Sequence, residues 1–205
     1  MLLVRNLHQS TCARDGHRGG RGPVASVGGH GVGSKIESNR GSRAYGRTLA
    51  AILAEQRDLL EGDLFLNLAT ADVARVPHIA IGVGFKVSSK PLRVTVLVVR
   101  EQALGFLDAL ATTRRIALEL GRAPAHESLQ IKGDDCVIDA AGAVERRLAS
   151  DYRGKLLRQF GVLGLGSEVA DAYLGPPSSE LVALRFTPQA IFQQKPGPQA
   201  GQPLA

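Results

Sequence analysis

Apolar residues come in short runs separated by turns over residues 64–138. Five of these runs have the length and the β-branched content of strands, and one has the period of an amphipathic helix. The strands are predicted at 64–70, 78–87, 92–99, 115–120 and 128–138, with the helix at 100–110. Short connections favour antiparallel pairing of successive strands, so this order predicts a small antiparallel β-barrel with a helix inserted after its third strand.

Further elements flank this core. Thr48 can cap a helix that ends at Gly62, because its hydroxyl can accept a hydrogen bond from the first turn and glycine commonly ends a helix. Two more helical segments are expected at 141–161 and 166–175, and a sixth strand at 180–186. We therefore predict an α+β fold that is mostly β: a six-stranded antiparallel barrel with flanking helices.

Two glycines stand on one side of the predicted strand 78–87. Gly82 and Gly84 share that side with Ala80, although glycine weakens a strand. Either a neighbouring backbone packs closely against this side or the strand bulges at a barrel corner, or else a flat ligand lies on this side, and the pattern leaves these readings open. The opposite side is apolar throughout, with Ile79, Ile81, Val83, Phe85 and Val87.

The charge of the chain is concentrated at its beginning. The first 48 residues hold eight Lys and Arg against two acidic residues, an excess equal to the whole formal charge of +6. The remaining residues carry 17 basic and 17 acidic groups. Ten of the 24 glycines also fall in the first segment, which has no apolar periodicity. Such a segment buries too little to offset the entropy of folding, so residues 1–47 are predicted to be disordered.

Three parts are therefore expected: a disordered Gly/Arg-rich basic tail at 1–47, the barrel domain at 48–192, and a flexible C-terminal tail at 193–205. The basic tail has three interpretations: an extension without function, an arm that touches RNA or acidic lipid, or a targeting peptide. No run reaches the roughly 18 apolar residues of a membrane span. We expect a cytoplasmic protein without a membrane anchor, with any nucleic-acid contact made through the tail.

The two cysteines indicate neither a disulfide nor a metal site. Cys12 lies in the predicted tail and Cys136 in a predicted strand, and neither belongs to a Cys-x-x-Cys pair. The histidines form no His-x-x-x-His pair either, so we expect no metal. Cys136 is read as a small buried apolar residue.

Polar residues alternate along the start of the fifth predicted strand. In an extended chain His126, Ser128, Gln130 and Lys132 point to one side, opposite apolar neighbours. Such a row faces either solvent or a polar ligand. A second candidate is Arg100, at a strand-to-helix junction where a guanidinium and free N–H groups both suit a phosphate. Arg100 could equally be a solvated arginine at a helix start.

These segments resemble the pyridoxamine 5′-phosphate oxidase-like family, the flavin-binding split barrels. The resemblance covers residues 64–201. It is carried by LATADVARVP, by the strand pair around GVGFKV and LRVTVLVV, by HESLQIKGDDCVI and by LRFTPQAIFQQKPGPQAG. It implies a split β-barrel that forms a homodimer, with a flavin mononucleotide (FMN) at each of two sites on the subunit interface.

The resemblance also implies roles for the candidate residues. It places the cofactor phosphate at the end of the third strand, which here is Arg100. The strand that carries His126, Ser128, Gln130 and Lys132 would approach the edge of the flavin ring. There Gln130 and Lys132 could donate hydrogen bonds to the ring carbonyls and stabilise negative charge. His126 is either a surface residue or an acid–base group, and no catalytic residue is predicted.

Some features differ from the pyridoxamine 5′-phosphate oxidases themselves. Those enzymes carry an arginine in the second strand and a serine with a basic residue at the following helix start. Here the second strand has no arginine, and Glu101 follows Arg100. The arginines expected near the C-terminus for the substrate phosphate are not recognisable either. The sequence therefore argues against oxidation of pyridoxamine phosphate itself.

The leading hypothesis is a flavin-dependent oxidoreductase acting on a small molecule, with the cofactor supplying the redox chemistry. The alternative is a binder of haem or a deazaflavin on the same fold, either non-catalytic or with a different activity. A haem would require His78 or His126 as its axial ligand, because these are the histidines outside the predicted tail. A third hypothesis is an RNA-associated protein that acts through the basic tail.

Overall fold

The computed structural model describes residues 48–123 and 125–204 of the chain. The tail predicted at 1–47 lies outside the described residues. The strands are β1 (Phe65–Ala71), β2 (Pro77–Ile81), β3 (Gly84–Ser89), β4 (Leu92–Val99), β5 (Ile116–Arg122), β6 (Glu127–Gly133), β7 (Val137–Ala140), β8 (Leu181–Phe186) and β9 (Ala190–Gln193). The helices are α1 (Leu49–Glu55), α2 (Arg57–Glu61), the short 3₁₀ helix η1 (Arg100–Gln102), α3 (Leu104–Thr113), α4 (Ala143–Val162) and α5 (Ser167–Leu174).

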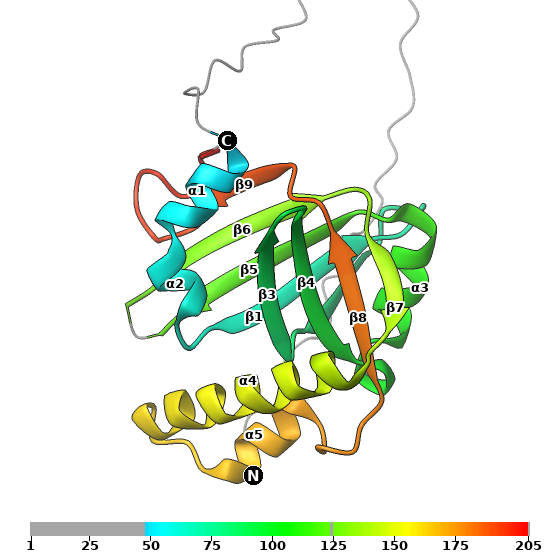
Figure 1. The fold of residues 1–205 in the computed structure, drawn as a ribbon, viewed down its shortest axis with the longest axis vertical. Helices are drawn as coiled ribbons and strands as arrows, with labels where there is room; N and C mark the ends of the chain where they lie inside the picture. Colours follow the sequence, from blue (N-terminus) through cyan, green and yellow to red (C-terminus); the bar gives the residue numbers. More distant parts are fainter. Residues whose placement is uncertain (1–47, 124, 205) are drawn as a thin grey trace, which may run out of the picture. The chain divides into compact units, whose positions relative to one another are not determined.

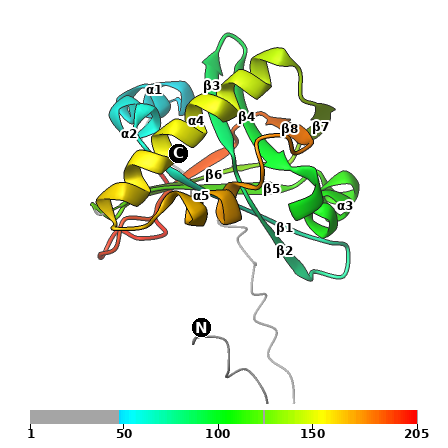
Figure 2. The same cartoon turned by 90° about the horizontal axis from the view of Figure 1, so that it is seen from below.

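The strands form two antiparallel sheets, one crossing in front of the other in Figure 1. The five-stranded sheet has the order β2-β1-β5-β6-β9, and the four-stranded sheet has the order β3-β4-β8-β7. Helices α1 and α2 lie on one side of this pair of sheets, and α3 lies on the other, in both views (Figures 1 and 2). Helix α4 packs against β3, and α3 packs against β1 and β2. The α+β arrangement agrees with the predicted fold class.

The core lies between the two sheets. β4 is buried on both faces, since no residue from Val94 to Val99 is more than 4% exposed. The five-stranded sheet instead buries alternate residues and turns the others outward, as expected for a sheet with one face on the core. Its inward side chains on β1, β5 and β6 are Leu66, Leu68, Leu118, Leu120, Leu129 and Ile131.

The predicted strand 78–87 is in fact two strands on different sheets. The Gly82 N–H donates to Leu66 of β1 at 2.8 Å, and the next N–H, of Val83, donates to Leu97 of β4 at 2.7 Å. A Cβ on Gly82 would lie 2.6 Å from the Leu66 Cβ. Close packing at a corner therefore explains this glycine. Because the chain changes sheets at this point, the residues predicted to share one apolar side do not share one environment. Ile79 is 79% exposed, whereas Val83 is 4% exposed.

The predicted strand 128–138 is likewise divided, into β6 and β7. Between them, the Asp135 carboxylate accepts hydrogen bonds from the Thr187 N–H and hydroxyl, both at 2.7 Å, and pairs with Arg93 at 3.2 Å. Burial acts to raise the pKa of Asp135, but these partners outweigh it and hold that pKa below its usual value. With β9 added, the described chain has nine strands, and the predicted count of six was wrong.

The helices follow the predicted positions with two differences. The cap is confirmed, because the Thr48 hydroxyl accepts from the Ala51 N–H at 3.2 Å, but the first helix divides at Gln56 into α1 and α2. After β4 the chain makes η1 before α3 begins. Leu107 is buried, whereas Leu104 is 59% exposed in the first turn of α3.

The C-terminal segment folds back on β9, although the sequence predicted a flexible tail there. The Gly201 N–H donates to Gln193 at 2.6 Å, and the Leu204 N–H donates to Ile191 at 2.7 Å. The Leu204 side chain packs against the core. Backbone groups make these hydrogen bonds, so the side-chain pattern of the segment contains no signal for them.

Helix α4 is held to the rest of the fold by polar contacts at its middle and near its start. The Tyr152 hydroxyl donates to the Leu64 carbonyl at 2.8 Å, and burial raises the pKa of this phenol. Near the start of the helix, Arg185 of β8 bonds Glu145 at 2.8 Å and also pairs with Asp139 of β7. The helix is long at 20 residues, but none of the helices described here is both long and apolar enough to cross a membrane.

Two glycine substitutions test the packing of the sheets. A Cβ on Gly133, at the end of β6, would lie 2.6 Å from the Phe186 ring and 2.8 Å from the Thr187 carbonyl oxygen. Gly133→Ala should therefore lower the free energy of unfolding by about 1–3 kcal/mol in urea denaturation. Gly154 in α4 has no atom within 4 Å of a Cβ position, so Gly154→Ala should raise stability by about 0.5–1 kcal/mol. Equal effects at the two positions would contradict this packing.

Candidate functional site

The candidate site is the outward face of the five-stranded sheet, opposite the core. Strand register brings residues from three strands together there: Asn67 is opposite Glu119, and Glu119 is opposite Gln130. On either side of this row, Gly121 pairs with Ser128 and Ala117 pairs with Lys132. These side chains are exposed or half-buried, so the face can be reached by a ligand or by another protein surface.

Small residues form a floor on this face. Ala69 is opposite Ala117 across β1 and β5, and Gly121 lies four residues further along β5, beyond Glu119. Methyl groups and a glycine on adjacent strands leave the backbone close to the surface. A planar group can lie flat over such a floor, whereas larger side chains would hold it away.

The three β6 residues predicted from the sequence share this face, as their spacing required. Ser128, Gln130 and Lys132 alternate with the buried Leu129 and Ile131. The Lys132 ammonium lies 4.5 Å from the centre of the Phe192 ring, a cation–π contact that holds it over the sheet. Together these residues place a hydroxyl, an amide and an ammonium along one edge of the floor.

A carboxylate also lies on the face, and the sequence analysis missed it. The Asn67 amide donates to Glu119 Oε2 at 2.7 Å, and Glu119 Oε1 would lie 3.1 Å from a Cβ on Gly121. Glu119 therefore adds a hydrogen-bond acceptor beside the small residues. Its position follows from the pairing of β1 with β5, and no motif in the sequence indicates it.

His126 does not lie on the strand face with the other three. It precedes β6 and has a φ of 52°, in the left-handed region, so the predicted alternation does not extend to it. The reason is the tight connection between β5 and β6, where Arg122 pairs with Glu127. The exposed His126 instead lines a shallow cavity of about 350 Å³ at the end of the face, together with Ser128 and Gln194.

Arg100 is separate from this group. It belongs to η1, at the end of β4 in the four-stranded sheet, and its Nε bonds Glu180 Oε1 at 2.6 Å. The backbone N–H of Arg100 also donates to the backbone carbonyl of Glu180 at 2.9 Å. Among the described residues, no hydrogen bond or ion pair joins Arg100 to the residues of β6. The two parts of the site predicted from the sequence thus lie on different sheets of one chain.

Three aromatic side chains border the face where β1 begins. The rings of Phe65, Phe160 and Tyr173 lie 5.8–6.1 Å apart, and the two contacts of Tyr173 are edge-to-face. Burial and, to a smaller extent, the charge of Glu119 raise the pKa of Tyr173. The trio connects α4 and α5 to the sheet, so it sets one limit of the open face.

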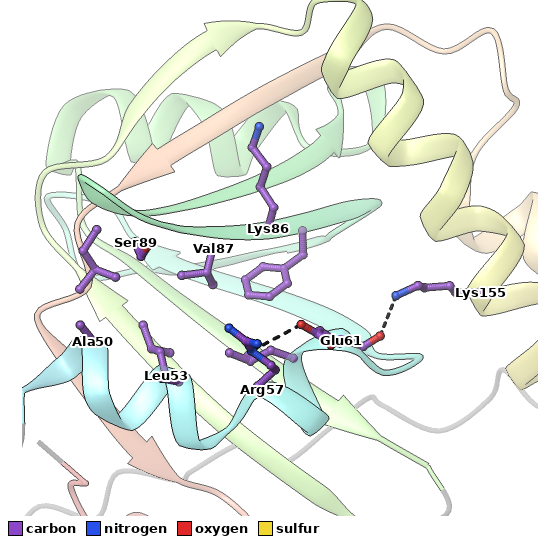
Figure 3. A pocket seen from close by; sticks show the side chains of 12 residues that line it. Ala50, Leu53, Arg57, Glu61, Lys86, Val87, Ser89 and Lys155 are labelled. Carbon is purple, nitrogen blue, oxygen red and sulfur yellow. Dashed lines mark hydrogen bonds and ion pairs between the residues drawn. The ribbon is translucent and has the colours of Figure 1, made fainter.

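A deeper groove lies elsewhere, between helices α1–α2 and strand β3 (Figure 3). It has a volume of about 420 Å³, within the range of roughly 300–1,000 Å³ of small-molecule pockets. Leu53, Val87 and Phe85 line its walls, and Arg57 and Lys155 lie at one end. None of the residues predicted from the sequence lines this groove, because its walls come from elements that the sequence pattern does not bring together.

Comparisons with known proteins give similarities in fold. No protein-family model and no curated protein matches the chain. Among solved structures, a protein of the pyridoxinephosphate oxidase family from Clostridium acetobutylicum is 12% identical, with a TM-score of 0.41, over 72% of this chain and 90% of that one. In fold, the chain resembles the pyridoxamine 5′-phosphate oxidase-like split barrels.

Two further solved structures match the chain to a similar extent. An F420 reductase is 18% identical, with a TM-score of 0.44, over 66% of this chain and 94% of that one. HutZ, described as the haem storage protein from Vibrio cholerae, is 14% identical, with a TM-score of 0.41, over 68% of this chain and 92% of that one. At these identities and TM-scores, the site of this chain has to be judged from its own residues.

The aromatic border can be tested by removing its sheet residue. Phe65 contacts both Phe160 and Tyr173, so Phe65→Ala should lower stability by about 2 kcal/mol and loosen α5. Amide hydrogen exchange should speed up in Ser167–Leu174 more than in β4. Unchanged exchange in α5 would show that the trio does not hold this helix.

Proposed function

We propose that the chain is an FMN-binding split-barrel oxidoreductase of the pyridoxamine 5′-phosphate oxidase-like type, with a small-molecule substrate. The observation that carries the proposal is the floor of small residues beside a row of hydrogen-bond donors on the outward face of the five-stranded sheet. Bound FMN would supply hydride or electron transfer, while the protein orients the ring and sets its electrostatic surroundings.

The residues of this face fit the edge of a flavin ring. That edge has carbonyl oxygens and ring nitrogens that accept hydrogen bonds, and one N–H that donates. Gln130 and Lys132 supply donors, and Glu119 supplies an acceptor on the neighbouring strand. The Lys132 ammonium would in addition favour negative charge on the ring, as a cation at short range does. The Ala69–Ala117 floor leaves room for a planar group between these side chains and β2.

The phosphate requires a further group, for which the sequence resemblance suggests Arg100. Its guanidinium is only partly exposed, at 41%, and already pairs with Glu180. A phosphate dianion would therefore compete with Glu180 for Arg100, and the neighbouring Glu101 would have to point away. This competition predicts modest affinity for FMN in the unmodified protein.

A homodimer would bring the two parts of the site together. Within one chain Arg100 and the β6 residues lie on different sheets, but in a pair of chains the donors of one could face Arg100 of the other. The exposed Ile79 on β2 and the half-buried Phe192 on β9 place apolar surface on the same outward face, which suits an interface between two copies. We infer that FMN would bind where the two copies meet.

A binder of haem or a deazaflavin is the second candidate. His126 favours haem, because it is exposed at the edge of the shallow cavity and could reach a ligand there. His78 is less suited, since its Nε2 lies 3.4 Å from the Asp72 carboxylate and the ring packs near Gly105 of α3. A deazaflavin would use the same floor and donors as FMN.

Titration with FMN tests the proposal. Lys132→Ala and Gln130→Ala should each weaken binding about tenfold, measured by the quenching of flavin fluorescence, because each removes a donor to the ring. Glu180→Gln should strengthen binding about two- to fivefold by releasing Arg100, as expected from the small free energy of an exposed ion pair. Lys86→Ala is the matched control, an exposed lysine on the other sheet.

Three results would contradict parts of this assignment. A protein that quenches no flavin fluorescence and keeps no flavin bands after desalting would exclude FMN. A Soret band after addition of haem, lost in His126→Ala, would favour the second candidate. Equal binding by the Glu180→Gln and unmodified proteins would remove Arg100 from the phosphate site.

A further inference from the structure

The groove between α1–α2 and β3 has different chemistry at its two ends. In Figure 3, Arg57, Glu61 and Lys155 gather at one end, and Ala50 and Ser89 lie at the other. β3 is the edge strand of the four-stranded sheet, so this wall of the groove is not covered by a further strand of that sheet. A groove that is charged at one end and mostly apolar along its length suits a ligand with the same two parts.

The walls of the groove are apolar side chains from two directions. Leu53 and Leu60 face it from α1 and α2, while Phe85 and Val87 face it from β3, with Leu92 at the start of β4. Figure 3 shows Leu53 and Val87 on opposite walls. These side chains could shield the body of an apolar ligand from water, which is the main source of its binding free energy.

Cations outnumber carboxylates around the groove. The Lys155 ammonium donates to the Glu61 carbonyl at 2.7 Å, which leaves two of its three N–H donors for other partners. Arg57 makes a long, exposed ion pair with Glu61, at 3.6 Å. Lys86 also lines the groove, although its side chain leaves β3 on the side away from α1 and α2 (Figure 3). Glu61 is the one carboxylate among the lining residues.

A second cavity of about 220 Å³ adjoins the groove and shares Leu60, Phe85 and Lys155 with it. Asp151 lies on its wall, one helical turn before Lys155. Negative charge there disfavours an anion, so a ligand carboxylate is expected on the groove side of Lys155. Its apolar part would then lie along Leu53 and Val87.

We propose that this groove binds a small amphipathic carboxylate, with the carboxylate at Lys155 and Arg57 and the aliphatic or aromatic body between α1 and β3. The site lies apart from the proposed flavin face and does not rest on it. It requires only the chain as described, in one copy.

Calorimetric titration with octanoate, compared with octan-1-ol, tests the proposal. Lys155→Met keeps the aliphatic stem but removes the charge, so it should weaken octanoate binding about tenfold and leave octan-1-ol binding nearly unchanged. Arg158→Met is the matched control on the same helix, because Arg158 bonds Asp63 and Gly154 and lines neither cavity.

A second pair of variants tests the position of the apolar body. Ala50 is exposed on α1 and lines the groove, so Ala50→Trp should fill it and abolish binding of both ligands without disturbing the core. Ala51→Trp, on the neighbouring exposed position outside the groove, should bind both normally. The proposal is overturned if octanoate does not bind the unmodified protein, if Lys155→Met binds it equally well, or if Ala50→Trp still binds it.

Discussion

The burial of β4 on both of its faces is the constraint on which the structure depends. Every residue from Val94 to Val99 is at most 4% exposed, and the strand pairs with β3 on one edge and β8 on the other. Such a strand can sit only in the interior, so other elements must cover it on both sides. The five-stranded sheet and the flanking helices are arranged around it.

The buried strand β4 can be predicted from the sequence, whereas the corners where the chain passes between the sheets cannot. A continuous apolar run such as Leu92–Val99 indicates a buried strand directly, and its boundaries agree with the structure. The corners at Gly82 and at Asp135 are different, because apolar residues stand on both sides of each of them. Whether a chain continues in one sheet or crosses to another is decided by tertiary hydrogen bonds, such as those of Asp135 with Thr187, and periodicity contains no record of them.

The residues of the candidate site also differ in whether the sequence predicts their positions. Ser128, Gln130 and Lys132 could be placed on one face from spacing alone, because a strand alternates strictly. His126 could not, since a left-handed residue in a tight connection ends the alternation. Glu119 and the floor of small residues come from strand register, and the groove of Figure 3 comes from the packing of α1 and α2 against an edge strand. Neither register nor packing can be read from a single sequence.

The two candidate sites differ in how their charges are balanced, and this bears on what each can bind. On the sheet face Glu119 lies on the strand next to that of Lys132, opposite Gln130 in register, so the face offers both donors and an acceptor to a planar, hydrogen-bonding group. At the end of the groove Arg57 pairs with the Glu61 carboxylate, whereas Lys155 bonds the Glu61 carbonyl rather than a charge. An anion gains more from a cation whose charge is not already neutralised. The face therefore favours recognition by hydrogen-bond pattern, and the groove favours recognition by charge at one end of an apolar body.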